Sequence, residues 1–198
     1  MFKSGLTIAI SSLLMVFVFN TWADAQIEKV TLHLDAFLCD NACANNIQSV
    51  MNVHKDEIKD VTIDYQKRQV TLIPNPEKLL DLYDIRQDLQ NAGHLPWKIE
   101  VTVTGEVVDY TKTYPKGHLH SRKALKVVET DQQFSLIEGE LLDKLLDFVK
   151  AGGEKVTVSG EIPAFGEKQV ALLVIKAFKE AKKEKGLGVV TFAVDGFD

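Results

Sequence analysis

The sequence contains little cysteine, little proline and no excess of basic charge. Its 198 residues include two cysteines and five prolines, and its formal net charge is −5. Two cysteines cannot form the dense disulfide framework that replaces a core in small secreted proteins, so ordinary apolar packing must stabilise the fold. A mildly acidic chain also lacks the basic surface that binds nucleic acid or anionic lipid. We therefore expect a hydrophobic core of the usual kind and no nucleic-acid partner.

The chain also lacks, near its start, an apolar run long enough to span a bilayer with ease. The run Leu6–Phe19 follows Lys3 and is shorter than the roughly 20 residues of a membrane-spanning helix. Ala23 and Ala25 then supply small side chains at the two positions that a signal peptidase reads. We expect residues 1–25 to be a signal peptide, with an uncleaved membrane anchor as the alternative. The mature protein is then periplasmic or secreted, has no stable membrane anchor and meets oxidising surroundings.

Residues 28–104 show short elements in regular alternation. Apolar side chains at every second position predict strands, and apolar side chains at helical spacing predict helices. Pro76 and Gly93 are suited to begin and end the second helix. The predicted order is strand, helix, strand, strand, helix, strand, which is the split βαβ arrangement of a ferredoxin-like sandwich. The predicted strands are residues 29–35, 60–66, 69–73 and 97–103, and the predicted helices are residues 41–52 and 76–93.

Both cysteines lie in the segment AFLCDNAC, between the first predicted strand and the first predicted helix. With this segment, residues 28–104 resemble a heavy-metal-associated domain, the fold of copper chaperones and periplasmic mercury-binding proteins. In that family a cysteine pair in the same loop binds the metal, so the resemblance implies that Cys39 and Cys43 are metal ligands. The family has Gly-Met-Thr or Gly-Met-His before the first cysteine and two residues between the cysteines. This chain has Ala-Phe-Leu and three intervening residues.

The chemistry of these residues suits a soft metal ion. The start of a helix presents backbone N–H groups, which favour the thiolate form of Cys43. Thiolates select Cu(I), Zn(II) or Hg(II), and two sulfur ligands suit two-coordinate Cu(I) or Hg(II) better than a closed zinc site. His94 follows the segment NAG, in the loop before the last strand of this half. In the resembling family that loop adjoins the cysteines, which makes His94 a third or tuning ligand. The alternative is a loop histidine that only bonds backbone.

Two other interpretations of the cysteines stay open. In an oxidising compartment neighbouring thiols form a disulfide by default, although closing so small a loop adds little stability through chain entropy. A thioredoxin-like redox pair is the weaker alternative, because that motif has two intervening residues in a different fold.

The second half of the chain predicts several strands and one helix. It resembles bacterial OB-fold modules, in which a short helix precedes a V-x-V-x-G strand, so we expect a small OB-like β-barrel. We place the two domains at residues 26–103 and 104–198, with no linker between them, so that one strand can run through the boundary near Val103. The apolar run 169–178 predicts a well-buried strand. The other predicted strands are residues 102–110, 134–139, 154–162 and 188–194, with a helix at 140–153 and a solvated charged segment at 178–186.

A second histidine pattern occurs in the segment YPKGHLHSRKAL. His118 and His120 are separated by one residue and would share one side of an extended chain. Because no third ligand stands beside them, we interpret this segment as a polar surface loop, with metal binding as the alternative.

Together these patterns predict an α+β protein that binds a soft metal ion after export, as a carrier, sensor or buffer. Copper, as Cu(I), is the first choice, with mercury or zinc as alternatives, and the expected partner is another exported or membrane metal-handling protein. The competing hypothesis is a periplasmic protein-interaction or scaffold module in which Cys39 and Cys43 form a structural disulfide. The sequence shows no nucleophile–base pattern, phosphate-binding loop or paired-carboxylate motif, so we do not expect an enzyme.

Overall fold

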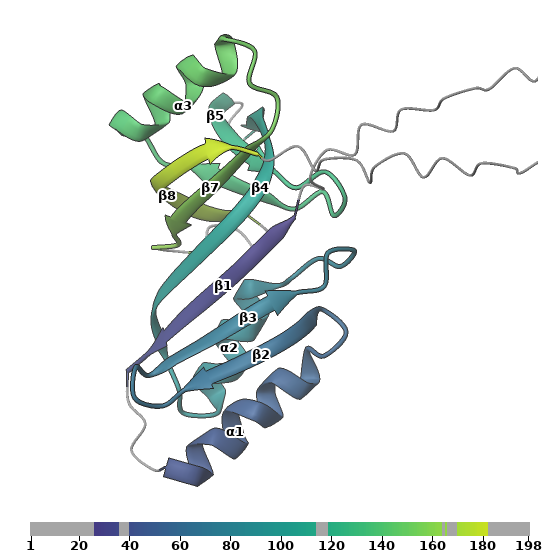
Figure 1. Cartoon of the computed structure of the whole chain (residues 1–198), viewed down its shortest axis with the longest axis vertical. Helices are drawn as coiled ribbons and strands as arrows, with labels where there is room; N and C mark the ends of the chain where they lie inside the picture. Colours follow the sequence, from purple (N-terminus) through teal and green to yellow (C-terminus); the bar gives the residue numbers. More distant parts are fainter. Residues whose placement is uncertain (1–25, 36–39, 114–118, 164, 166–169, 182–198) are drawn as a thin grey trace, which may run out of the picture.

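The computed structural model describes residues 26–35, 40–113, 119–163, 165 and 170–181. Within these residues the chain forms three helices and one mixed sheet of eight strands, so the expectation of an α+β protein is confirmed (Figure 1). None of the described helices combines the length and the apolar character needed to cross a bilayer. In chain order the elements are β1 (Ile27–Leu34), α1 (Asp40–Val53), β2 (Ile58–Asp64), β3 (Gln69–Pro74), α2 (Leu82–Asn91), β4 (Pro96–Thr113), β5 (Leu119–Lys126), β6 (Gln133–Leu136), α3 (Glu140–Lys150), β7 (Val156–Glu161) and β8 (Val170–Glu180).

The first half of the chain places two helices against one face of four antiparallel strands. The strand order is β2-β3-β1-β4. The predicted alternation of β1 is confirmed, because Val30, Leu32 and Leu34 are all buried. They belong to one core with Ile47 of α1 and Ile85 of α2. Apolar burial of this kind stabilises a strand and a helix together, since neither can bury its apolar side alone.

The second helix begins later than the sequence predicted. Pro76 suggested the start, but α2 begins at Leu82 because Asp81 caps it. The Asp81 carboxylate accepts hydrogen bonds from the backbone N–H groups of Tyr83 and Asp84, both at 3.0 Å. A capping aspartate satisfies donors that have no partner inside the helix, which outweighs the preference of proline for the first turn. The predicted end at Gly93 is confirmed within two residues.

β4 is the longest strand and belongs to both halves of the structure. Its residues 96–103 pair with β1, residues 100–105 pair with β7 on the opposite edge, and residues 106–113 pair with β5. Figure 1 shows β4 running from the lower half into the upper half. The expectation that one strand runs through position 103 is therefore confirmed.

The second half forms a barrel-like ring of strand pairings. The circuit runs β4, β5, β6, β8, β7 and back to β4, with β6 and β8 parallel and the other neighbours antiparallel. α3 connects β6 to β7. Leu125, Phe134, Val158 and Leu173 are fully buried and belong to the hydrophobic core.

β8 differs from the strand that the sequence predicted. We expected burial on both faces, but Ala171, Leu173 and Ile175 are buried while the intervening residues are half-buried. One face of β8 meets the barrel interior and the other is partly open to solvent, so buried and half-buried side chains alternate along the strand. The apolar run therefore does not mark a strand that is buried on both faces. Residues 178–180, expected in a solvated charged segment, continue β8 because they pair with β7. The strand predicted at residues 188–194 lies outside the described residues.

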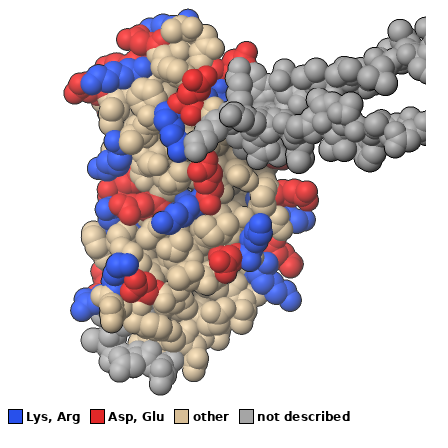
Figure 2. Space-filling model, in the orientation of Figure 1, with Lys and Arg blue, Asp and Glu red and all other residues tan. Residues whose placement is uncertain are grey.

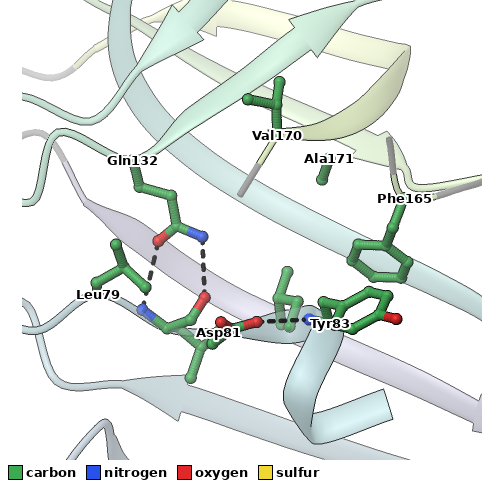
Figure 3. A pocket seen from close by; sticks show the side chains of 9 residues that line it. Leu79, Asp81, Tyr83, Gln132, Phe165, Val170 and Ala171 are labelled. Carbon is green, nitrogen blue, oxygen red and sulfur yellow. Dashed lines mark hydrogen bonds between the residues drawn. The ribbon is translucent and has the colours of Figure 1, made fainter. Parts of the chain in front are cut away.

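A small cavity marks the contact between the two halves, beside the start of α2 (Figure 3). Here the Gln132 amide pairs with the backbone of Leu80, donating to its carbonyl at 2.9 Å and accepting from its N–H at 3.4 Å. On the other side of the cavity, Phe165 makes an edge contact with Tyr83 at 5.8 Å between ring centroids. Arg86 lies 5.6 Å from the centroid of the Phe165 ring. The Gln132 contact joins the second half to the segment that leads into α2, and the Phe165 contacts join it to α2 itself.

The Gln132 contact predicts a measurable loss of stability on substitution. Gln132→Ala leaves the buried N–H of Leu80 without its partner and removes one of the two hydrogen bonds to the Leu80 carbonyl, which also accepts from the N–H of Leu82. We expect this loss to lower the free energy of unfolding by about 1–3 kcal/mol. Gln133→Ala is the matched control, because the buried Oε1 of Gln133 has no hydrogen-bond partner among the described residues. We expect that control to change stability by less than about 0.5 kcal/mol. Urea unfolding measures the stability of both variants. Equal losses of stability in the two variants would show that the Gln132–Leu80 hydrogen bonds are not the cause.

Candidate functional site

The candidate site lies at the end of the first-half sheet where β1 leads towards the cysteines. The backbone N–H of Leu34 donates to the carbonyl of Arg68 at 3.0 Å, and that of Asp35 donates to the carbonyl of Leu95 at 3.3 Å. The Arg68 guanidinium also donates to the carbonyl of Asp35 at 3.2 Å. The β2–β3 turn and the loop before β4 are thereby attached to the residues that precede Cys39. The loop that carries His94 thus adjoins the entry to the cysteine segment.

Cys43 lies in the first turn of α1 and faces the core. Its side chain is 4% exposed, on the same face of the helix as the buried Ile47. The sulfur of Cys43 is disulfide-bonded. The chain has one other cysteine, Cys39, which lies outside the described residues. Metal binding by Cys43 therefore requires that this bond first be reduced, since the thiolate is the ligand.

His94 is held by the end of α2. Gly93 adopts the left-handed conformation, with φ of +86°, and its N–H donates to the carbonyl of Gln90 at 3.0 Å. The His94 N–H reaches back to the carbonyl of Leu89 at 2.8 Å. These two bonds form a Schellman motif, which satisfies the last carbonyls of a helix and turns the chain sharply. The turn buries His94, which is 5% exposed.

The structure therefore buries two of the three predicted ligands, Cys43 in the first turn of α1 and His94 just after the end of α2. The three-ligand set is untested, because Cys39 lies outside the described residues. Within the described part of the chain no group of three histidine, cysteine, aspartate or glutamate side chains is arranged to hold a metal ion. The second histidine pattern is also untested, because His118 and the side chain of His120 are outside that part.

The helix beside the candidate site carries almost no charge. Asp40 is the one charged residue of α1, whereas α2 and α3 contain acidic and basic side chains along their length. The exposed side of α1 consists mainly of amide and hydroxyl side chains. Figure 2 shows blue and red residues interspersed over the molecule, with few of either around the end where α1 lies. Depletion of charge is typical of the central part of protein interfaces.

Sequence reasoning missed a polar cluster on the other face of this sheet. His33 Nε2 lies 2.9 Å from Glu100 Oε2, and Gln69 Nε2 lies 3.3 Å from His33 Nδ1. Trp97 is the extra residue of a β-bulge opposite β1, and its ring lies 5.5 Å from that of His33. The bulge turns Trp97 outwards, where it is 62% exposed. The alternation of β1 could have shown that His33 faces away from the helices, but not that Glu100 lies beside it.

The charges of this cluster influence one another. The Lys98 ammonium bonds to Glu100, and this bond, followed by the bond to His33, holds the pKa of Glu100 below its ordinary value. The same bond to Glu100 raises the pKa of Lys98. An opposite charge at hydrogen-bond distance favours the ionised form of both partners.

His54, which the sequence analysis did not single out, links the end of α1 to α2. Its Nε2 lies 3.0 Å from Asp88 Oδ2 of α2, and its Nδ1 lies 3.7 Å from Glu57 Oε1. His54 is buried just beyond the end of α1. We interpret this contact as structural, because it joins the end of α1 to α2 and because Glu57 also accepts a hydrogen bond from the backbone N–H of Asp81.

Comparison with known proteins gave no relative. The chain matches no protein-family model, no curated protein and no solved structure.

The Schellman motif predicts a specific cost of substitution at Gly93. No described atom lies within 4 Å of the position that a Cβ would take, so only the positive φ opposes a side chain. Gly93→Ala should lower the free energy of unfolding by about 1 kcal/mol. Gly93→Asn is the matched control and should cost less, because asparagine tolerates the left-handed region. Equal costs for the two variants in urea unfolding would show that φ is not the cause.

The depressed pKa of Glu100 predicts a pH-dependent contribution to stability. The contribution is present above the ordinary pKa of 4.5 and is lost as the pH falls through the lower value in the folded protein. Glu100→Gln should therefore be less stable than the wild type at pH 7, and the difference should shrink as the pH falls below 4.5. Urea unfolding at a series of pH values measures this difference. A difference that stays constant down to pH 3 would contradict the expectation.

Proposed function

We propose that this protein binds a soft metal ion, Cu(I) in the first place, as an exported carrier, sensor or buffer. Cys39 and Cys43 bind the metal in the reduced state, and His94 is the third ligand. The observation that carries the proposal is that Cys43, in the first turn of the helix that follows β1, and His94, in the loop that bonds to the end of β1 through Leu95, are both buried. A thiolate and an imidazole are ligands that suit copper, mercury and zinc.

The proposal includes an architecture for each half. Residues 26–103 form a ferredoxin-like sandwich, and residues 104–198 form an OB-like barrel. The first assignment is supported by the antiparallel order β2-β3-β1-β4 with a helix after the first and third strands. The second is supported by the five-strand ring with α3 between its third and fourth strands.

Metal transfer in this proposal proceeds by exchange of thiolate ligands with a second exported or membrane metal-handling protein. Cys43 is almost fully buried, so a partner's thiolate does not reach its sulfur directly and the exchange must begin at another ligand of the metal. The surface of α1, whose one charged residue is Asp40, offers that partner a contact area with few charge–charge interactions. The disulfide of Cys43 must be opened by a thiol reductant before the metal enters.

The competing function, an exported interaction or scaffold module, has one specific observation in its favour. Cys43 is disulfide-bonded and packed into the core, as a structural staple would be. In that case the cysteines have no metal-binding role, and the surface of the second half carries the interaction.

An anaerobic Cu(I) titration of the reduced protein against a competing chelator separates these functions. We expect one Cu(I) per chain, and we expect Cys39→Ser to lose at least tenfold in affinity because a single thiolate and an imidazole remain. His94→Gln should weaken binding by a smaller factor. His118→Ala is the control and should bind Cu(I) like the wild type.

Two results would contradict the metal-binding function. One is absence of binding by the fully reduced protein, and the other is equal binding by Cys39→Ser. Either result, together with both thiols found oxidised in protein taken directly from the cell envelope, would favour the structural disulfide. A loss in His118→Ala equal to that in Cys39→Ser would move the site to the second half.

A further inference from the structure

A polar cavity lies where three strands meet side by side. Over residues 100–103, β4 has β1 on one edge and β7 on the other. The cavity at this junction has a volume of about 200 Å³ and lies on the face turned away from α1 and α2, because its residues alternate with the buried apolar residues of β1. We call it the junction cavity. Its polar side chains are Lys29, Thr31, Glu100, Thr102, Ser159 and Lys176.

Two β-bulges flank the junction cavity. On β1, Glu28 is the extra residue between the pairs that join Ile27 and Lys29 to β4. On β8, Lys176 is the extra residue opposite Ser159 and Gly160. A bulge changes the direction of a side chain relative to the regular alternation of a strand. This change explains why Lys176 of β8 lines the cavity.

Close approach of the strands supports the second bulge. A Cβ at Gly160 would lie 2.5 Å from the carbonyl oxygen of Val174, so no larger residue fits there without a shift of β7 or β8. β7 and β8 thus approach each other closely beside the bulge, where Lys176 has no paired residue on β7.

The floor of the junction cavity is lined with hydroxyl groups. Lys29, Thr102 and Ser159 form one row across β1, β4 and β7. The hydroxyls of Thr102 and Ser159 lie 3.2 Å apart, and either one can donate to the other. Thr31 adds a third hydroxyl and is 8% exposed. The three hydroxyl groups offer hydrogen-bond donors at the floor of the cavity. The ammonium groups of Lys29 and Lys176 offer positive charge at its sides.

The carboxylates near the cavity are already engaged. Glu100 has one oxygen at His33 and the other at Lys98, so its charge is compensated within the sheet face. Glu161 lies 3.6 Å from Lys176, which is a loose ion pair. Glu28 accepts a hydrogen bond from the Thr104 hydroxyl at 2.6 Å and is thereby held at the bulge.

We propose that the junction cavity binds a tetrahedral oxyanion such as phosphate, either free or as the end of an ester. Lys29 and Lys176 hold the charge from two sides, and the hydroxyls of Thr31, Thr102 and Ser159 donate to its oxygens. A tetrahedral anion presents four acceptor oxygens to these five groups, whereas a carboxylate presents two. The site is independent of the metal-binding function, because it lies on the opposite face of the sheet from α1.

The test is a titration of the purified protein with inorganic phosphate at low ionic strength, followed by NMR of the backbone amides. We expect saturable shifts at Thr102, Ser159 and Gly160. Lys29→Gln and Lys176→Gln should each weaken binding about tenfold, as loss of a charge-assisted hydrogen bond predicts. Glu161→Gln should strengthen binding, because it releases Lys176 from its ion pair.

Lys67→Gln is the matched control, because Lys67 pairs with Asp64 at the β2–β3 turn, away from the cavity. It should bind phosphate like the wild type. Absence of saturable shifts at the three amides would overturn the proposal. Shifts unchanged in the Lys29→Gln/Lys176→Gln double variant would overturn it as well. A parallel titration with sn-glycerol 3-phosphate decides between a phosphate ester, which should bind more tightly, and the free anion, for which the ester adds nothing.

Discussion

The pairing of β4 with a strand on each edge is the constraint on which the rest of the structure depends. Between residues 100 and 103 the strand has β1 on one side and β7 on the other. Val101 and Val103 are consequently buried on the face that meets the core, while Glu100 and Thr102 face the opposite way. A shift of one residue in either ladder would exchange these faces along the whole strand. The register of both halves is therefore fixed by one segment.

β4 determines the positions of the two proposed sites. β4 begins at Pro96, which pairs with Leu34, and that pairing attaches the loop of His94 to the chain that enters the cysteine segment. The bulge at Trp97 follows at once and turns an aromatic ring onto the outer face. A few residues further on, the same strand supplies Thr102 to the junction cavity. The two proposed sites are therefore connected through one continuous strand.

The sequence was sufficient to predict the strands and helices whose apolar residues follow a local pattern. The alternation of Val30, Leu32 and Leu34 and the spacing of Ile47 and Met51 each report burial on one side, and the structure confirms them. The order of the elements then restricts the sheet topology. Errors arose where two local signals competed, as at the start of α2, where Asp81 outweighs Pro76. The contacts of His33 with Glu100 and of Gln132 with Leu80 join residues far apart in the chain, so only a known strand register could have found them.

The disulfide of Cys43 and the proposed metal-binding function are compatible on energetic grounds. A disulfide between cysteines with three residues between them closes a very short loop, so it removes little entropy from the unfolded chain. The fold does not depend on that small term, because the core around α1 includes the fully buried Ile47 and Leu89 and continues through β1 and β4. We therefore expect reduction of the bond to leave α1 in place. A pair that stabilises the fold only slightly can alternate between an oxidised resting state and a metal-bound state without unfolding the domain.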